Sequence, residues 1–438
     1  MRWNLQKAPD SQKVRALSKA LGVESTLAKL LVQRGIETFE AAKAFFRPSL
    51  DQLHDPYLMK DMDLAVARIE SAVQQGQNIL VYGDYDVDGT TSVSLLSSYL
   101  LETYAQVTTY IPDRYQEGYG ISYQGIDFAS DNDISLIIAL DCGIKALDKV
   151  AYASEKDIDF IICDHHRPGQ EIPKAVAVLD PKRNDCHYPY DELCGCGVGF
   201  KLIQALSISK GQDFQELRPY LDLVATAIAA DIVPMTGENR ILAYHGLQVI
   251  NQNPRPGIQA LLQQVAKTTF TITDVVFVIA PRINAAGRMK HGLHAVDLLT
   301  ESNLEKAQKF AAAIETYNSD RKDLDKKITD QALQQIKDLQ EEERFTSVVY
   351  QADWHKGVIG IVASRLIENH YRPTLVFAKS GDTLAASARS VKGFDVYKAL
   401  EACSEYIEQF GGHKYAAGLT LLPENYEPFK AAFEEVVK

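Results

Sequence analysis

Short apolar runs alternate with amphipathic stretches from residue 61 onward. Strands are predicted at 78–82, 107–111, 136–140, 160–163 and 175–179, and helices at 62–74 and 90–103. Apolar runs without interspersed polar residues are typical of strands that are buried on both faces. The pattern therefore predicts an α/β fold with a parallel sheet between helices.

The regions on either side of this sheet have different patterns. Residues 1–60 predict short helices, such as 26–34 and 39–46, with Pro48 and Pro56 as helix breakers. Residues 303–344 are highly charged and contain neither Pro nor Gly, which predicts one long helix or two abutting helices. A second α/β block follows, with strands near 346–352, 374–380 and 386–390 and a helix at 358–369. We expect a helical segment (1–60), an α/β domain (61–300), a connecting helix (301–345) and a smaller α/β domain (346–438).

Composition limits the class of protein. None of the apolar runs among the 438 residues approaches the roughly 18–20 residues that cross a bilayer. The N-terminus lacks the apolar core of a signal peptide, and six cysteines in a chain of this length do not indicate a disulfide framework. We expect a soluble, cytoplasmic protein. The net charge of −12 argues against tight non-specific binding to nucleic acid, although a local basic groove can exist on an acidic protein.

Three aspartates, Asp84, Asp86 and Asp88, follow the predicted strand 78–82 and precede Gly89. Clustered carboxylates repel one another unless a cation lies between them, and oxygen ligands suit Mg²⁺ or Mn²⁺. An EF-hand calcium loop also opens with this spacing. It requires a glutamate where this chain has Leu95, so the pattern favours a different metal site.

Further metal-ligand candidates follow two other predicted strands. Asp141 follows 136–140, and Asp164, His165 and His166 follow 160–163. Asp231 lies in an apolar helical stretch, where a carboxylate must be paired, hydrogen-bonded or metal-bound. Taken singly, Asp141 could be a turn residue and Asp231 could pair with Arg240. Because ligands bind at the carboxyl ends of parallel strands, their common position favours one metal-binding edge.

Four segments in this order, GDYDVDGTTS, DCG, DHH and ADIVPMTGENR, resemble the motifs of the DHH phosphoesterase superfamily. The later segments ARINAAGRM, SARS and GGHKYAAG are similar to those of its RecJ branch, single-strand-specific 5′→3′ DNA exonucleases. The resemblance extends from about residue 80 to about residue 420. It implies a DHH domain, a connecting helix and a DHHA1 substrate-binding domain.

The resemblance also implies two Mn²⁺ or Mg²⁺ ions, which would activate water and stabilise the attacking and leaving oxygens of phosphodiester hydrolysis. The products would be nucleoside 5′-monophosphates. The implied ligands are Asp86, Asp88, Asp141, His165 and Asp231, with Asp84 either a ligand or next to one. Either Asp88 or Asp141 would bridge the two ions. Asp164 would orient a histidine, and His166 would face the scissile phosphate.

In the second domain, the resemblance implies that His413 contacts the scissile phosphate and that Gly411 and Gly412 allow close approach of the backbone. Ser387 and Arg389 would hold a terminal 5′-phosphate. Further phosphate-binding candidates, each of which could instead be structural, are Arg114, Arg282 and Arg288. Asn284 could be a hydrogen-bonding partner or a turn residue.

Other features allow two interpretations. Tyr115, Tyr119 and Tyr123 could stack on bases or simply pack. Cys194 and Cys196, with Cys186 and His187 nearby in sequence, could bind zinc, but the Gly-rich segment is more typical of a turn or a nucleotide cover.

Two other functions are compatible with these motifs. The alternative enzyme is a DHH phosphatase acting on short oligonucleotides or small nucleotides, and the non-enzymatic alternative is a replication scaffold that has lost metal ligands. Members of the RecJ branch usually continue into a C-terminal OB-fold, which we do not expect in these 438 residues, either because the chain is trimmed or because it is a short relative. We therefore expect activity that is more salt-sensitive and less processive than in a full-length relative. The resemblance suggests single-strand-binding protein and a RecQ-type helicase as partners of a monomer.

Overall fold

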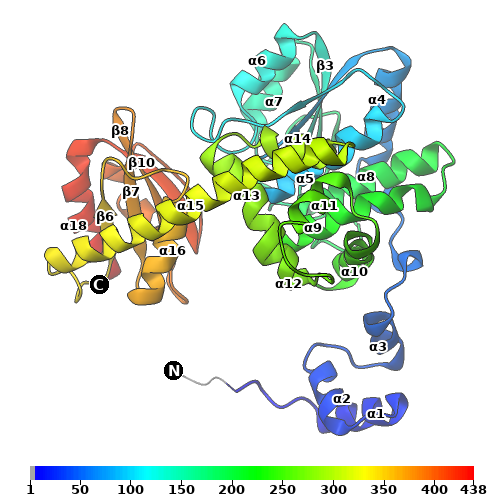
Figure 1. Ribbon diagram of the computed structural model, residues 1–438, viewed down its shortest axis with the longest axis horizontal. Helices are drawn as coiled ribbons and strands as arrows, with labels where there is room; N and C mark the ends of the chain where they lie inside the picture. The colour runs from blue at the N-terminus through cyan, green and yellow to red at the C-terminus, as the bar shows by residue number, and fades with distance from the viewer. Residues whose placement is uncertain (1–4) are drawn as a thin grey trace. The chain divides into compact units, whose positions relative to one another are not determined.

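The computed structural model describes residues 5–438, which form two compact units (Figure 1). The first unit comprises the described residues up to Ala280 together with Val296–Gln308. The second comprises Pro281–Ala295 and Lys309–Lys438. Each unit is built around its own five-stranded sheet.

The first unit contains the predicted parallel sheet. Its strand order is β2-β1-β3-β4-β5, and each pair is parallel. The strands are β1 (Asn78–Gly83), β2 (Val107–Tyr110), β3 (Ile134–Leu140), β4 (Asp159–Cys163) and β5 (Ala177–Leu179). All five strand predictions are therefore confirmed, with small shifts at the ends.

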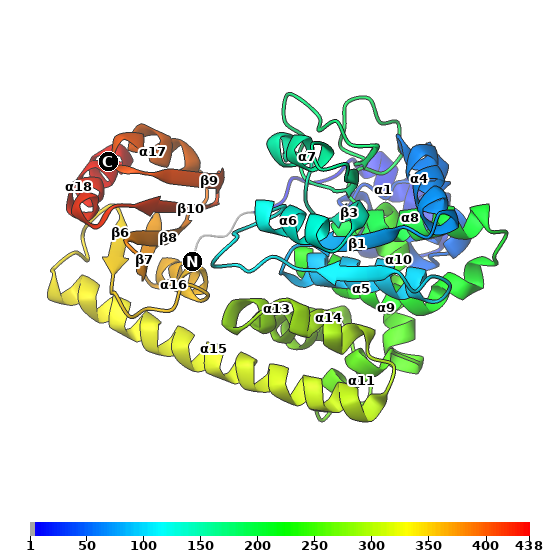
Figure 2. The same cartoon turned by 90° about the horizontal axis from the view of Figure 1, so that it is seen from above.

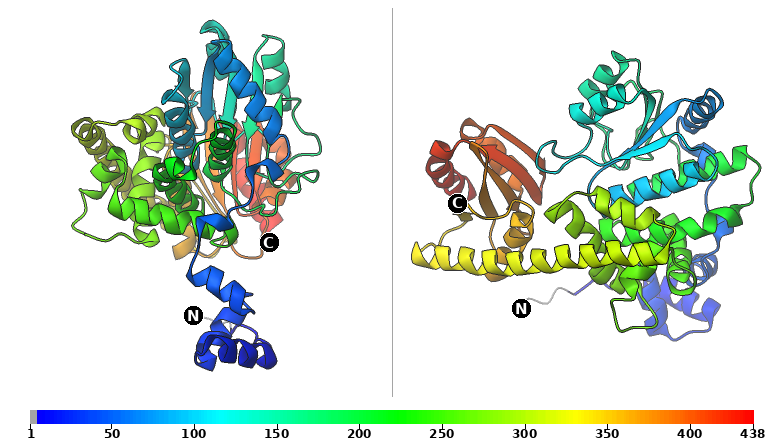
Figure 3. Two further views of the ribbon diagram at one scale, coloured as in Figure 1. Left: turned by 90° about the vertical axis from the view of Figure 1, so that its right-hand side faces the viewer. Right: turned by 45° about the horizontal axis from the view of Figure 1, so that its top comes forward.

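Helices cover both faces of this sheet (Figure 2). On one face, α6 (Tyr123–Asp131) and α7 (Leu147–Ser154) pack on a core that includes Tyr82 and Phe160. On the other lie α4 (Met62–Gln74), α5 (Val87–Leu101) and α8 (Gly195–Ser209). A further helical layer follows (Figure 3): α9 (Leu221–Asp231) packs on α5, and α10 (Gly237–Gln252) packs on α9.

The remaining helices of the first part of the chain are short. They are α1 (Ser11–Leu21), α2 (Ser25–Val32), α3 (Phe39–Phe46), α11 (Pro256–Leu262), α12 (Ile272–Asp274), α13 (Ala280–Met289) and α14 (Leu293–Thr300). Short 3₁₀ helices occur at Leu50–Gln52, Pro56–Leu58 and Phe214–Tyr220, and a π-helical turn occurs at Val275–Ile279. The contacts group α13 with the second unit, although the predicted domain boundary lies at residue 300.

The second unit has a mixed sheet of order β6-β7-β8-β10-β9, in which only β6 and β7 are parallel. One face packs on α15 (Leu304–Asp338) and α16 (Ile359–Asn369), and the other on α17 (Val396–Ala402) and α18 (Tyr426–Val437). The strands are β6 (Ser347–Tyr350), β7 (Thr374–Ser380), β8 (Thr383–Arg389), β9 (Gln409–His413) and β10 (Ala416–Leu421). Two further turns are Ser404–Tyr406 and Pro423–Asn425.

The long charged stretch forms one continuous helix, α15, of 35 residues that connects the two units. Its charge prevents it from serving as a membrane span, and no other helix within 5–438 combines the length and apolar character that a bilayer crossing needs. The predicted α/β architecture, with a connecting helix and a smaller second α/β unit, is confirmed.

A fully buried ion pair fastens two helices of the first unit. Lys201 of α8 and Glu238 of α10 are 0% and 1% exposed, and Lys201 Nζ lies 2.7 Å from Glu238 Oε1. Tyr188 Oη donates a 2.6 Å hydrogen bond to Glu238 Oε2, and the His54 amide donates to Oε1 at 2.9 Å. Lys201 Nζ also donates to the His54 carbonyl and to Gln204 Oε1. Every charge in this network is paired, as burial requires.

We predict that Lys201→Met lowers the free energy of unfolding by about 3–5 kcal/mol, because it leaves Glu238 buried without its cation. Urea denaturation followed by circular dichroism measures this loss. The matched control is Lys210→Met at the exposed end of the same helix, which should change stability by less than about 0.5 kcal/mol. Equal effects of the two variants would contradict the role assigned to the buried pair.

Candidate metal centre

The acidic and histidine residues singled out in the sequence lie at one edge of the parallel sheet. Asp84 follows β1, Asp141 follows β3 and Asp164 follows β4. These three strands are neighbours and parallel, so their carboxyl ends meet at the same edge. All three carboxyl groups are at most 3% exposed.

The turn after β1 is held by backbone contacts that allow little side-chain bulk. Asp86 caps α5, and its Oδ1 accepts a 3.1 Å hydrogen bond from the Gly89 amide. A Cβ at Gly89 would lie 2.3 Å from the carbonyl oxygen of Asp84, so this position requires glycine. Because of the Asp86 cap, α5 begins at Val87 rather than at the predicted residue 90. Asp88 is thereby placed in the first helical turn, and the helix occupies most of what would be an EF-hand loop.

The Asp88 carboxylate is bound by the N-terminus of another helix. Its two oxygens each accept a 2.7 Å hydrogen bond, Oδ2 from the Gly195 amide and Oδ1 from the Cys196 amide, at the start of α8. A Cβ on Gly195 would lie 2.6 Å from the Cβ of Asp141, so glycine lets the helix approach. These amide donors lie 107 and 108 residues from Asp88, and the sequence analysis missed them.

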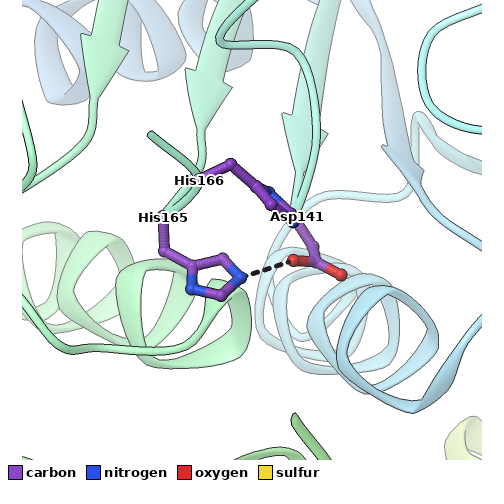
Figure 4. Close-up of side chains that lie close together, drawn as sticks. All are labelled: Asp141, His165 and His166. Carbon is purple, nitrogen blue, oxygen red and sulfur yellow. Dashed lines mark ion pairs between the residues drawn. The ribbon is translucent and has the colours of Figure 1, made fainter. Parts of the chain in front are cut away.

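Three carboxylates surround the imidazole of His165. Its Nε2 lies 3.2 Å from Asp141 Oδ1, 3.7 Å from Asp231 Oδ2 and 3.8 Å from Asp88 Oδ2. Figure 4 shows the His165 ring directed at the Asp141 carboxylate. Asp231 is the last residue of α9 and pairs here rather than with Arg240, which donates to the Phe45 carbonyl.

Burial and repulsion shift the pKa values of this cluster. Burial and the Asp86 charge raise the pKa of Asp84 to about 8 and that of Asp231 to about 6. Burial and neighbouring carboxylates also raise the pKa values of Asp88 and Asp141 well above their usual range. Burial lowers the pKa of His165 to about 3, so its ring is neutral at pH 7.

This donor set fits divalent cations. Both ring nitrogens of His165 and both carboxylate oxygens of Asp84 are buried without a hydrogen-bond partner. One possible ligand set is Asp88, His165 and Asp231, and another is Asp141, His165 and His166; in each, the ligand atoms lie within 4.8 Å of one another. A neutral imidazole and carboxylate oxygens are ligands that Mn²⁺ and Mg²⁺ accept. A cation would also remove the repulsion that raises the carboxyl pKa values.

Asp164 organises the segment that carries both histidines. Its Oδ1 accepts hydrogen bonds from the amides of His165 (2.7 Å) and His166 (3.1 Å) and lies 2.7 Å from His166 Nδ1. Its Oδ2 accepts from the Ile144 amide. Burial alone would raise the pKa of Asp164, but these hydrogen bonds and the charge of His166 lower it to about 2. Burial would lower the pKa of His166, but the hydrogen bond to Asp164 and the charge of that carboxylate raise it above its usual value.

The loop between β2 and α6 brings further side chains to the same edge. Tyr119 Oη lies 3.3 Å from His166 Nε2, and the guanidinium carbon of Arg114 lies 3.8 Å from the centre of the Tyr85 ring. Glu117 holds this loop by accepting hydrogen bonds from Tyr110, Ser122 and the Asp113 amide. The three tyrosines considered for stacking do not share a surface, because Tyr123 packs against Tyr152 while Tyr119 packs against Tyr85.

The substrate-binding candidates of the second unit lie on β8, β9 and α13. On β8, Arg389 donates a 3.0 Å hydrogen bond to Ser387 Oγ. Both side chains lie against Gly360 of α16, where a Cβ would be 2.9 Å from Ser387 Oγ and 3.0 Å from Arg389 Nη2. Glycine at this position thus lets both side chains pack closely against α16.

His413 is exposed at the end of β9. Gly412 has a φ of 139°, and a Cβ there would meet β10 at 2.5 Å, so the hairpin itself requires this glycine. Gly411 meets no such neighbour.

Two of the three candidates on α13 have structural contacts within the second unit. Arg282 Nε lies 2.5 Å from Glu315 Oε2, and Arg288 donates to the Gly357 carbonyl at 3.0 Å. Asn284 Oδ1 is buried without a hydrogen-bond partner. Roles for these residues in substrate binding stay predictions.

The cysteines considered for zinc have other contacts. Cys194 caps α8, with its sulfur accepting from the Gly197 amide, and Cys186 accepts from the Lys60 amide. The Gly-rich segment forms the beginning of α8 rather than the expected turn, because Cys194 caps the helix there.

Comparison with known proteins identifies both units. Residues 78–228 match the DHH family, N-terminal domain, and residues 343–438 match the DHHA1 domain. The single-stranded-DNA-specific exonuclease RecJ of Bacillus subtilis is 39% identical over 440 residues, covering 100% of this chain and 55% of the relative. RecJ of Haemophilus influenzae is 34% identical over 408 residues, covering 89% of this chain and 71% of the relative.

A solved structure agrees with these matches. The crystal structure of RecJ from Thermus thermophilus in complex with Mn²⁺ superposes with a TM-score of 0.87 at 29% identity. The superposed region covers 100% of the present chain and 62% of the Thermus thermophilus chain. The present chain thus spans little more than half the length of some of its relatives. On the sequence identity, the two matched domains and the shared fold, it belongs to the RecJ family of DHH/DHHA1 proteins.

Proposed function

We propose that this chain is a metal-dependent exonuclease that degrades single-stranded DNA from the 5′ end and releases nucleoside 5′-monophosphates. The observation that carries the proposal is the cluster of Asp88, Asp141 and Asp231 around the neutral imidazole of His165. The names of the RecJ relatives support the substrate and the strand specificity.

Two divalent ions at this edge would supply an activated water and would stabilise the charge that develops on the phosphate oxygens. The proposed ligands are Asp86, Asp88, Asp141, His165 and Asp231, with Asp84 as a further ligand or a neighbour of one. The α8 amides hold the Asp88 carboxylate at a fixed orientation, so its position does not depend on the substrate.

His166 is the residue best placed to act on the substrate. Its side chain is 44% exposed, while its Nδ1 is held by the buried Asp164 carboxylate. This pairing favours the protonated ring, which can stabilise phosphate charge or give a proton from Nε2 to a leaving oxygen. Tyr119 restrains the same nitrogen from one side.

The other residues predicted from the sequence would bind the phosphates of the DNA strand. Arg389 and Ser387 form a compact pair that suits a terminal 5′-phosphate, and Arg114 would contact the strand near the metal edge. His413, Gly411, Gly412, Arg282, Asn284 and Arg288 are further candidates. Single-strand-binding protein and a RecQ-type helicase are the proposed partners of a cytoplasmic monomer, on family membership alone.

The direct test is digestion of 5′-labelled and 3′-labelled single-stranded oligonucleotides with Mn²⁺, beside the matching duplex and a dinucleotide. We predict early release of labelled mononucleotide from the 5′ end only, with the duplex spared. Chelation with EDTA should abolish the reaction. Cleavage of the dinucleotide alone would instead support the small-nucleotide phosphatase.

We predict that His165→Ala lowers kcat at least about 1,000-fold while the chain stays folded, because it removes the ligand on which three carboxylates converge. Steady-state kinetics and circular dichroism measure the two effects. The control is His187→Ala, which removes an exposed imidazole and should leave kcat unchanged. Full activity of the His165 variant would refute the site assignment.

Metal binding should also change how stability depends on pH. Without metal, Asp84 and Asp231 have pKa values near 8 and 6 in the fold, above the roughly 3.9 of an unfolded aspartate. The folded state therefore holds more protons, and stability should fall as the pH rises from about 4 to about 8.

Because bound cations favour the ionised carboxylates, Mn²⁺ should raise the melting temperature more at pH 8 than at pH 5. Differential scanning fluorimetry tests this, with Asp84→Asn expected to flatten the metal-free profile. Equal Mn²⁺ effects at both pH values would contradict the assignment.

A further inference from the structure

A cavity of about 250 Å³ lies beside His166, and no step of the proposed hydrolysis uses it. Asp164 and His166 form part of its lining, and Tyr119, Ile121 and Ile144 provide aromatic and aliphatic surface. It also includes two lysines, Lys145 and Lys149, from the segment that follows β3. A molecule in this cavity would therefore contact the residue proposed to act on the phosphate.

The lining suits a nucleobase. Tyr119 is 57% exposed and offers aromatic surface for stacking, whereas Ile121 and Ile144 are 6% and 2% exposed and form an apolar wall. The volume is below the roughly 300–1,000 Å³ of pockets for drug-sized ligands. It therefore suits one base with part of its sugar.

The two lysines supply charge that the described residues do not neutralise. Lys145 is exposed and Lys149 half-buried. Within 5–438, neither ammonium group forms an ion pair, and Lys149 Nζ instead lies 5.6 Å from the centre of the Tyr123 ring. A phosphodiester that leaves the cavity would meet both cations.

We propose that this cavity binds the nucleoside next to the scissile phosphate and that Lys145 and Lys149 bind the following phosphate of the strand. The inference rests on the proposed nuclease function, because His166 links the cavity to the reacting phosphate. It adds a substrate-binding site to the first unit, distinct from the arginines and Ser387 of the second.

Such a site has a consequence for substrate choice. A base can enter a cavity of this size only when it is not paired with a second strand, because the complementary base would have no space. The cavity would thus select single-stranded DNA close to the metal edge.

The test measures binding rather than cleavage. The probe is a thymidine tetranucleotide with phosphorothioate linkages and a 3′ fluorophore, titrated by fluorescence anisotropy with Mn²⁺ present. We expect the double variant Lys145→Met, Lys149→Met to bind about tenfold more weakly at low salt. The slope of log Kd against log salt should fall by about 0.7, since the two lysines neutralise one phosphate and each neutralised phosphate on a single strand contributes about 0.7. Lys156→Met, just before β4 and so towards the opposite edge of the sheet, should bind like the parent.

A second variant tests the cavity itself. Ala146 also lines it, and Ala146→Phe would fill it while leaving both lysines in place. The parent chain should bind the thymidine probe about tenfold more tightly than an abasic probe of the same length, through stacking, and the Phe variant should lose this difference.

The outcomes separate this site from the nuclease assignment. Equal binding by the parent and the lysine variant, or no preference for the base in the parent, would overturn the cavity proposal while digestion of single strands could still stand. Lysine-dependent binding without any cleavage would retain the nucleotide site and refute the nuclease. No binding by the parent chain would contradict both.

Discussion

Carboxylates crowded around one buried imidazole set the constraint on which the rest of the first unit depends. Two like charges about 4 Å apart near a protein surface repel by roughly 4 kcal/mol. Asp88, Asp141 and Asp231 all approach His165 Nε2 within 3.8 Å. Burial, together with this repulsion, raises the pKa values of the three carboxyl groups when no cation is present. Divalent cations would neutralise the repulsion between these carboxylates. The crowding that destabilises the metal-free fold therefore also makes this edge of the sheet suited to bind metal.

The surrounding structure holds this arrangement through close backbone approach rather than through bulky side chains. Gly89 lets the turn after β1 close on Asp84, and Gly195 lets α8 reach Asp141. Asp141 itself has a φ of 59°, an uncommon conformation for a residue with a Cβ. Such backbone strain is characteristic of functional sites that the surrounding fold fixes in place. The buried pair of Lys201 and Glu238 fixes α8 to α10, and α8 also supplies the amides that hold Asp88.

Each unit contributes a different chemistry. The first has the carboxylates, the histidines and the cavity beside His166, and it matches the DHH family over 78–228. The second matches the DHHA1 domain and presents an arginine and a serine on an antiparallel strand, with no acidic cluster like that of the first unit among its described residues. Under the proposed function, the first unit would supply the metal chemistry and the second would recognise phosphate, because a long polyanion must also be bound away from the reacting bond.

The sequence by itself determined the parallel sheet, the long helix and the strand ends at which the proposed metal ligands lie. Parallel strands that are buried on both faces require continuous apolar runs. Ligands bind at the carboxyl ends of such strands, so ionisable residues directly after an apolar run indicate a candidate site. Short stretches of sequence therefore predict both features. Asp231 was predicted only to need a partner, since a carboxylate in an apolar helix must be paired, and the structure decided for His165 rather than Arg240.

Only the tertiary structure decided what surrounds those residues. The amides of Gly195 and Cys196 reach Asp88 across more than 100 residues, and Tyr119 meets His166 across 47. Neither contact can be predicted from a local or periodic sequence pattern, because each depends on the order of strands in the sheet and on the packing of α8. The cavity lined by Lys145, Lys149 and His166 also depends on tertiary packing. Its lining residues come from separate segments of the chain, so no one segment predicts it.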